Sequence, residues 1–415
     1  KHHQVNIPLF PQSALNNSKL TKVNRALINW YRLDRNIGGA QNDPYTRIVD
    51  QNEIFPNRTI QPGLNIFRPM DITYYPSRRG QYNYDVPNGT TYSAGVDAAG
   101  RLREPETRWG GIMRGLTVND FQASNIEYIE FWMLNPFMVT PSQQRPAKGG
   151  YLYIDLGNIS EDILKDGRAA FENGLPRQGQ SVALDTTNLG VVPITVPFVN
   201  AFDNDPDVRQ AQDVGLDGMN DEAEQAFLSD YLAEMQAGVR ADVYDEILAD
   251  PANDNFIHFL DDSLNPNIST LERYAKFNHV DGNSPNNTGN SRFATSFTFL
   301  PTTEDINRDF TSDRIEGYFH YKIPIFNDGS NRLALTDYVT DSISTRGGGE
   351  VWYRFVVPIQ EFDKKVGAIQ DFRSIRFMRM YLHGFDEKVT MRFATLDLVR
   401  NSWRRFLRPN LLSER

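Results

Sequence analysis

The 415-residue chain is longer than the roughly 250 to 300 residues at which a single hydrophobic core stops growing, so we expect two or more domains. A hydrophobic content of 40% and a charged content of 23% are typical of a globular protein, whereas the net charge of -10 argues against binding to nucleic acid. The absence of cysteine excludes disulfides, thiolate metal sites and cysteine nucleophiles.

The start of the chain, Lys1-His2-His3-Gln4, lacks the apolar run of a signal peptide. We therefore expect the chain to begin at a mature end or inside a larger protein. No stretch of about 18 apolar residues occurs, so no transmembrane helix is expected.

Residues 1–200 show weak helical periodicity and frequent turn signals, which predict short strands and long loops. The clearest strands are Ile126 to Leu134 and Tyr151 to Leu156. Both faces of the first strand are largely apolar, which favours a place inside a sandwich. The region is predicted to be a first β-sandwich domain.

Residues 201–280 have a different composition, because an acidic run leads into helical spacing of apolar residues. The pattern predicts a helix over Asp221 to Gly238 and a shorter one over Ala241 to Leu248, which ends before Pro251. These residues are predicted to form an acidic, mainly helical connector. The polar run Asp281 to Asn290 then has the composition of a linker.

Residues 281–415 return to strand-like alternation, in Tyr318 to Ile325, Val351 to Val357, Ile375 to Leu382 and Met391 to Val399. This region is predicted to be a second β-sandwich domain. The predicted fold class is therefore mainly β, with two jelly-roll-like β-sandwich domains joined by a partly helical connector.

The segment Asp213 to Glu224 matches a calcium-binding loop at positions 1, 5, 6, 9 and 12, and it leads into the predicted helix. Gly218 would make the sharp turn, but Gly215 stands at position 3, where one ligand is expected. The alternative is that these acidic residues bind no ion and only stabilise the start of the helix, where their negative charges lie near the positive end of the helix dipole. The candidate ligands are oxygen donors: Asp213, Asp217, the carbonyl of Met219, Asp221 and Glu224.

The sequence contains no nucleophile elbow and no phosphate-binding loop, and its six histidines show no metal-ligand spacing. We therefore predict that the chain is not an enzyme, and calcium is the one cofactor for which we find a candidate site. Adjacent carboxylates such as Glu161 and Asp162 are interpreted as solvated surface, because 53 acidic residues make such pairs frequent by chance.

Aromatic residues make up 12% of the chain, and tryptophans in loops can stack on sugars. Trp30 and Trp109 occur in loop-rich stretches and are the candidate exposed platforms. A carbohydrate-binding surface module is therefore the alternative functional hypothesis.

Long strings of this sequence resemble the SprA family, called Sov in some species, which are giant outer-membrane translocons of the type IX secretion system of Bacteroidetes. The similar strings occur in order along most of the chain: Asn42 to Val49, Asn65 to Tyr84, Trp109 to Leu116, Asn125 to Phe137, Leu152 to Pro176, Asp213 to Asp221, Leu271 to Pro285 and Phe372 to Arg405.

The resemblance implies a structural or gating role in protein export and gliding motility, as a soluble, extracellular or pore-lining segment of an outer-membrane protein. It implies as partners the other parts of the translocon, a PorV-like barrel, a periplasmic plug protein and secreted cargo. No binding residue is carried over from the family. The tyrosines of residues 65–84 are predicted either to form contact surface or to pack on their own domain.

Overall fold

The computed structural model describes residues 3–4, 7–37, 42–59, 66–168, 170–172, 183–194, 202–203, 208, 212, 214–278, 300 and 302–401. Strand residues outnumber helical residues among them, which confirms the mainly β fold class. The two largest sheets have six strands each, and every pairing within them is antiparallel.

The first sheet, which we call sheet A, is built around two long hydrogen-bonded neighbours, β8 and β11. Its strands in spatial order are β1 (His3–Gln4), β6 (Trp109–Gly115), β15 (Phe377–His383), β8 (Gly149–Asn158), β11 (Gly317–Phe326) and β14 (Lys364–Val366).

The second sheet, which we call sheet B, has the strand β7 near its middle, as the two apolar faces of that strand predicted. Its strands in spatial order are β12 (Val339–Thr345), β13 (Glu350–Pro358), β7 (Ile126–Leu134), β16 (Val389–Arg400), β5 (Met70–Arg79) and β2 (Ala26–Tyr31).

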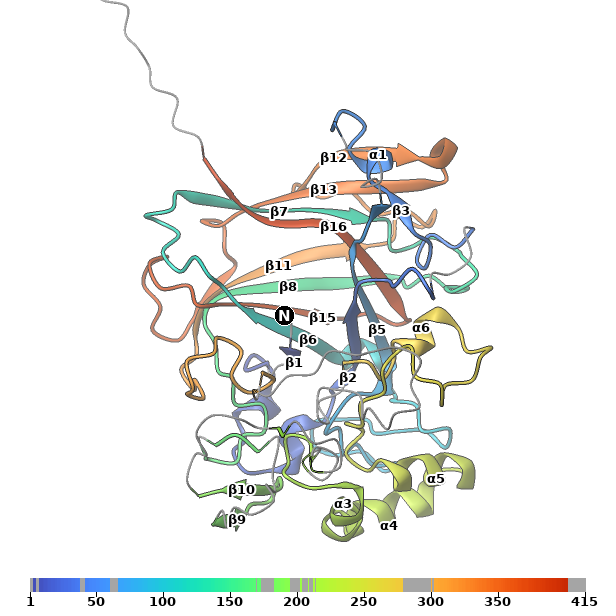
Figure 1. The fold of residues 1–415 in the computed structure, drawn as a ribbon, viewed down its shortest axis with the longest axis vertical. Helices are drawn as coiled ribbons and strands as arrows, with labels where there is room; N and C mark the ends of the chain where they lie inside the picture. Colours follow the sequence, from blue (N-terminus) through green and yellow to red (C-terminus); the bar gives the residue numbers. More distant parts are fainter. Residues whose placement is uncertain are drawn as a thin grey trace, which may run out of the picture.

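Eight of these strands form one jelly roll (Figure 1). Numbered one to eight along the chain, β5, β6, β7, β8, β11, β13, β15 and β16 lie in the order 1-8-3-6 in sheet B and 2-7-4-5 in sheet A. That order is the double Greek key of a jelly-roll sandwich. The predicted jelly-roll type of fold is therefore present.

The arrangement differs from the predicted division into a sandwich over 1–200 and another over 281–415. Each sheet combines strands from both regions, because β7 pairs with β13 and β16, and β8 pairs with β11 and β15. Alternation along a strand reports which side chains face the core but carries no information on the pairing partner. The four jelly-roll strands before residue 159 and the four after residue 316 were therefore predicted to be two separate domains.

The core lies between the two sheets. Inward side chains of sheet B such as Ile129, Phe131 and Met133 meet inward side chains of sheet A such as Ile154 and Ile323, and all five are fully buried. Within sheet B the Phe131 ring stacks on Phe355 with 4.6 Å between ring centroids. Alternate residues of each strand thus fill one continuous apolar layer.

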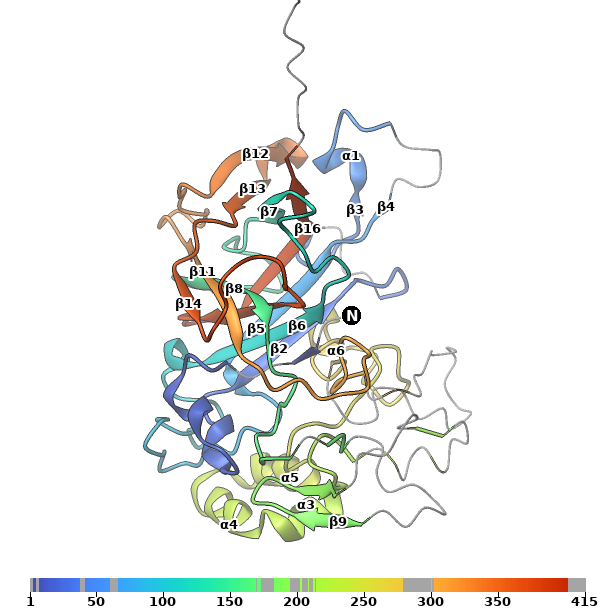
Figure 2. The same cartoon turned by 90° about the vertical axis from the view of Figure 1, so that its left-hand side faces the viewer.

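The chain between β8 and β11, residues 159–316, is a long insertion into the jelly roll, and we call it the insert. Its described elements are β9 (Leu184–Thr186), β10 (Val191–Pro193), α3 (Asp221–Phe227), α4 (Ser229–Gly238), α5 (Ala241–Ala249) and α6 (Thr270–Arg273). Both views place α3, α4 and α5 at the opposite end of the molecule from β12 and β13 (Figures 1 and 2).

The helix predicted over Asp221 to Gly238 forms as two helices, α3 and α4, which meet at Leu228. The shorter predicted helix is α5, which ends just before Pro251. The predicted linker over 281–290 lies outside the described residues. Among the helices that the structure describes, none is long and apolar enough to cross a membrane.

Short elements complete the described chain. They are the strands β3 (Val49–Asp50) and β4 (Ile66–Phe67), the helix α1 (Gln51–Ile54), and the 3-10 helices at Pro11–Ala14, Lys19–Lys22, Pro105–Thr107 and Arg346–Gly348.

Candidate metal centre

Three carboxylates of the insert meet in a buried cluster, which we call the carboxylate triad: Asp217, Glu224 and Asp254. One oxygen from each lies within 4.8 Å of the others, and the three residues are 1 to 3% exposed. Among the residues that the structure describes, this is the group whose acidic or imidazole ligands could share one metal ion.

Local structure brings the triad together from three segments. Asp217 lies in the loop before α3, and Glu224 lies in the first turn of that helix. The side chain of Asn220 caps the helix by accepting a hydrogen bond from the N–H of Ala223 at 3.0 Å. Asp254 follows α5, where Pro251 prevents the helix from continuing.

The jelly roll contacts the triad through Tyr82, in the loop after β5. Its hydroxyl donates a hydrogen bond to Asp254 Oδ2 at 2.7 Å and accepts one from the N–H of Leu216 at 2.6 Å. Its backbone N–H donates to the carbonyl of Ala252 at 2.7 Å. The single side chain and its own amide thus join the end of β5 to two segments of the insert.

The other two triad carboxylates each accept one backbone hydrogen bond. Asp217 Oδ1 accepts from the N–H of Met219 at 3.1 Å, and Glu224 Oε2 accepts from the N–H of Ala252 at 2.9 Å. Asp217 Oδ2 is buried and has no hydrogen-bond partner in the part of the chain that the structure describes. A buried polar atom in that state costs roughly 1–3 kcal/mol unless a ligand satisfies it.

Burial and mutual repulsion shape the charge of the triad. Burial raises the pKa of Asp217 well above its usual range, and the carboxylates of Asp254 and Asp221 raise it further. Burial, followed by Asp254 and Asp217, raises the pKa of Glu224 to about 12. Because the charged groups that act most strongly on both residues are carboxylates, the cluster must hold either protons or a cation.

The structure brings together two of the five ligands that the sequence predicted, Asp217 and Glu224. Asp221 lies apart, where its carboxylate accepts a hydrogen bond from Asn255 Nδ2 at 3.1 Å. Met219 contributes its N–H to Asp217, and Asp213 lies outside the described residues. Asp221 is the first residue of α3, and its carboxylate is not among the three whose oxygens lie within 4.8 Å of one another.

Sequence reasoning missed Asp254, which follows Glu224 by thirty positions and belongs to no recognisable spacing. A signal was present at Gly215, which stands at position 3 of the calcium-loop pattern, where one ligand is expected. A Cβ at Gly215 would collide with Asp254 Oδ2 and Tyr82 Oη. The carboxylate of Asp254 therefore occupies the space that a side chain at position 215 would take.

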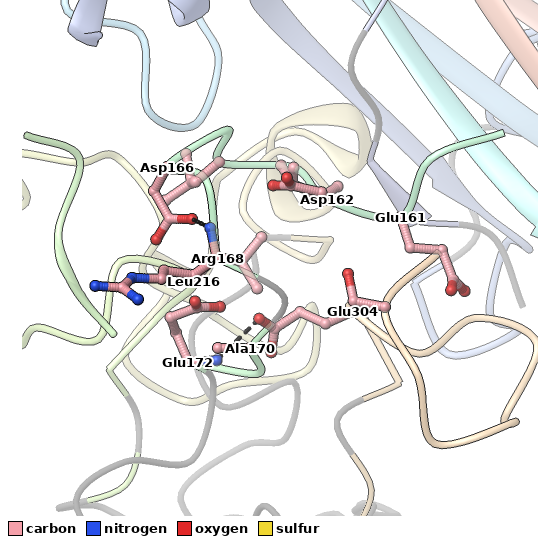
Figure 3. A pocket seen from close by; sticks show the side chains of 11 residues that line it. Glu161, Asp162, Asp166, Arg168, Ala170, Glu172, Leu216 and Glu304 are labelled. Carbon is pink, nitrogen blue, oxygen red and sulfur yellow. Dashed lines mark hydrogen bonds between the residues drawn. The ribbon is translucent and has the colours of Figure 1, made fainter. Parts of the chain in front are cut away.

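A second acidic group lies nearby, around a small pocket of the insert (Figure 3). Here Glu304 accepts a hydrogen bond from the N–H of Glu172 at 3.0 Å. Glu161 stands apart from these two in the figure, and its carboxylate accepts backbone hydrogen bonds from three residues: Ile306, Asn307 and Asp313. These carboxylates therefore hold the insert's own backbone.

The prediction that Glu161 and Asp162 lie on the solvated surface is wrong for Glu161, which is 1% exposed, and Asp162 is half-buried. Burial raises the pKa of Asp162 to about 7, although Lys22 acts in the opposite direction. Glu161 is buried because its loop packs against residues 306–313. Two adjacent carboxylates in a sequence do not indicate such a contact between distant segments.

The predicted sugar platform at Trp109 is wrong, because this residue is fully buried at the start of β6. Its ring stacks on Phe10 at a centroid distance of 5.9 Å, and the guanidinium of Arg25 lies 5.4 Å from the ring. Trp30 is half-buried on the edge strand β2, where its N–H donates to Asn278 Oδ1 at 2.7 Å. An N-terminal segment covers Trp109, which its loop-rich sequence context did not show.

Comparison with known protein families gives a match to part of the chain. Residues 230–411 match the family model SprA_N, which is described as a motility related/secretion protein. The matched range contains four jelly-roll strands, β11, β13, β15 and β16, and also Asp254. No curated protein matches the chain. Over residues 230–411 the chain is therefore similar to the SprA family of motility-related secretion proteins, which confirms the resemblance found in the sequence.

Proposed function

We propose that this chain is a non-catalytic structural domain of a SprA-like translocon that exports proteins across the bacterial outer membrane. The observation that carries the proposal is the match of residues 230–411 to a motility-related secretion family. The domain would serve the channel by holding the insert in a fixed position, and it would lie outside the bilayer at the pore.

The way the insert is attached supports a positioning role. It leaves the jelly roll at the end of β8 and returns at the start of β11, and these two strands pair along their whole length from Gly149–Phe326 to Asn158–Gly317. Both ends of the insert are therefore anchored at one point of sheet A. A rigid sandwich with one large projecting segment is suited to present that segment to a neighbour.

The neighbours that the proposal assigns are the barrel of the same translocon, a PorV-like barrel, a periplasmic plug protein and secreted cargo. The exposed faces of α4 and α5 are the surface by which the insert would meet them, since Glu234 and Gln236 of α4 and Asp245 of α5 are exposed. This surface projects beyond the sheets in both views (Figures 1 and 2).

The test replaces residues 183–278 in the parent translocon of a type IX-secreting bacterium with a short Gly/Ser linker. We expect the translocon to reach the outer membrane in normal amount while cargo accumulates in the periplasm. A matched control carries Asp341→Asn and Ser344→Ala on the edge strand β12, and it should secrete as the wild type does. Normal cargo secretion by the replacement strain would contradict the proposal.

A glycan array tests the competing sugar-binding hypothesis with the 415-residue chain. Strong and saturable binding to a glycan would contradict a role confined to the channel. The burial of Trp109 removes the principal platform on which that hypothesis depended.

A further inference from the structure

We propose that Asp217, Glu224 and Asp254 bind one calcium ion, which fastens the insert to the end of β5 through Tyr82. Nothing in the family match assigns a metal to these residues. The proposal stands independently of the secretion function, because it concerns how two parts of this chain are held together.

The spacing of the oxygens suits calcium. Calcium binds oxygen ligands at about 2.3–2.6 Å, so two ligands on opposite sides of one ion are roughly 4.6–5.2 Å apart. The three triad oxygens all lie within 4.8 Å of one another. Magnesium binds at about 2.0–2.1 Å, usually keeps several waters and is seldom held by side chains alone, so a site made of three carboxylates favours calcium.

An independent observation points to a ligand at this place. Asp217 Oδ2 is fully buried and accepts no hydrogen bond from the described residues, although Oδ1 of the same carboxylate is held by the N–H of Met219. One oxygen of this carboxylate lies within 4.8 Å of oxygens of Glu224 and Asp254. A cation among the three carboxylates would satisfy Oδ2 and balance their charge.

Asp254 completes the loop that the sequence leaves incomplete. In the calcium-loop pattern the third position supplies a side-chain oxygen, and this chain has Gly215 there. Gly215 has a positive φ of 58°, and its missing side chain leaves room for the carboxylate of Asp254. A residue from a distant segment thus supplies the ligand that the loop itself lacks.

The ion would join three segments of the insert. Asp217 precedes α3, Glu224 lies within it, and Asp254 follows α5. Tyr82 fixes the orientation of Asp254 and connects it to the jelly roll. Calcium would therefore stiffen the attachment of the helices of the insert to the sandwich.

The experiment uses the 415-residue chain after treatment with a chelator, and it titrates calcium by calorimetry. We expect one ion to bind per chain and the melting temperature to rise with calcium concentration, because a ligand that binds only the folded state stabilises it. Magnesium at the same concentrations should give a much smaller shift. Absence of both binding heat and a calcium-dependent melting shift would overturn the proposal.

Two matched variants separate the triad from the loop pattern in the sequence. Asp254→Asn removes a triad carboxylate and should weaken calcium binding by more than about tenfold. Asp221→Asn removes a predicted ligand that the structure places outside the triad but near Asp217, and it should weaken calcium binding far less than Asp254→Asn does. Equal binding by Asp254→Asn and the wild type, or an equal loss in Asp221→Asn, would overturn the assignment.

Terbium gives a second readout that does not depend on the stability of the variants. Terbium occupies calcium sites and emits when an adjacent aromatic ring absorbs light, and the Tyr82 hydroxyl lies 2.7 Å from Asp254 Oδ2. We expect sensitised terbium emission that falls when calcium displaces the terbium. Asp217→Asn should abolish this emission, while the melting temperature of this variant in chelator stays near that of the wild type. Emission that persists in Asp217→Asn would count against the site.

Discussion

Each sheet of the jelly roll contains a fully buried arginine paired with an aspartate on the neighbouring strand. In sheet B, Arg392 Nε lies 2.8 Å from Asp71 Oδ1, and in sheet A, Arg379 Nη2 lies 2.7 Å from Asp155 Oδ2. The partners stand opposite each other in the strand register. Slipping either strand by one residue would separate a buried charge from its counter-charge, so the pairs favour one register.

We expect Arg392→Met to lower the free energy of unfolding by about 3–5 kcal/mol, because it leaves the Asp71 carboxylate buried without a cation. Urea unfolding followed by circular dichroism measures the change. The control is Arg354→Met, which removes a partly exposed partner of Glu130 and should cost less than about 1 kcal/mol. Similar losses in the two variants would contradict the buried-pair argument.

A second prediction at this scale concerns Glu172, which is buried against Glu304. Burial and the Glu304 carboxylate raise the pKa of Glu172 well above its usual range. The folded state therefore holds this proton more tightly than the unfolded chain, so its stabilising contribution is present in acid and is lost as the pH rises through the raised pKa.

We expect Glu172→Gln to reduce the decline in melting temperature between about pH 5 and about pH 9, since glutamine cannot lose a proton there. Melting curves across that range measure the slope. Glu222→Gln, at an exposed position on α3, should keep the wild-type slope. A steeper decline in Glu172→Gln than in the wild type would show that the sign is wrong.

Secondary-structure elements of the insert formed where local sequence signals were strong. The acidic first turn, with Asp221, Glu222 and Glu224, and the cap at Asn220 begin α3 at the predicted residue. The break at Leu228 was not predicted, since apolar spacing continues across it. There the backbone has φ −99° and ψ 20°, while the side chain is 1% exposed in the core cluster.

We expect Asn220→Ala to lower the free energy of unfolding by about 1 kcal/mol, because the first turn of α3 loses its side-chain acceptor. Chemical unfolding of the purified chain tests the value. Gln236→Ala, at an exposed position of α4, should change stability by less than about 0.5 kcal/mol. An unchanged stability in Asn220→Ala would mean that the cap contributes little.

On the scale of the whole molecule, the jelly roll depends on both ends of the chain. Strands β5, β6, β7 and β8 come from the first 158 residues, and their partners β11, β13, β15 and β16 come after residue 316. Every inner strand of one group is hydrogen-bonded to the other group. Neither group can close a sandwich by itself.

We therefore expect neither residues 1–200 nor residues 281–415 to unfold cooperatively when expressed alone, because each fragment would expose half of the core and unpaired strand edges. Thermal melts and limited proteolysis of the two fragments measure this, with the 415-residue chain as the reference. A cooperative melt from either fragment would support the division into two sandwiches that the sequence suggested.

The candidate site was partly predictable. Asp217 and Glu224 were found because they lie seven residues apart in a local pattern, and Gly215 marked the missing ligand. Asp254 and Tyr82 were not found, since they reach the site from other segments. Tyr82 is one of the tyrosines of residues 65–84 that were predicted either to form contact surface or to pack on their own domain. It is fully buried, so it packs inside the protein.

The sequence by itself determined the mainly β class, the helices near residues 221–249 and the resemblance to a secretion family, because composition, periodicity and caps act over a few neighbouring residues. The tertiary structure alone decided that the strands before and after the insert share two sheets, that Trp109 is covered, and that Asp254 joins the triad. Each of these depends on contacts between segments far apart in the chain, which the spacing of residues along one segment does not encode.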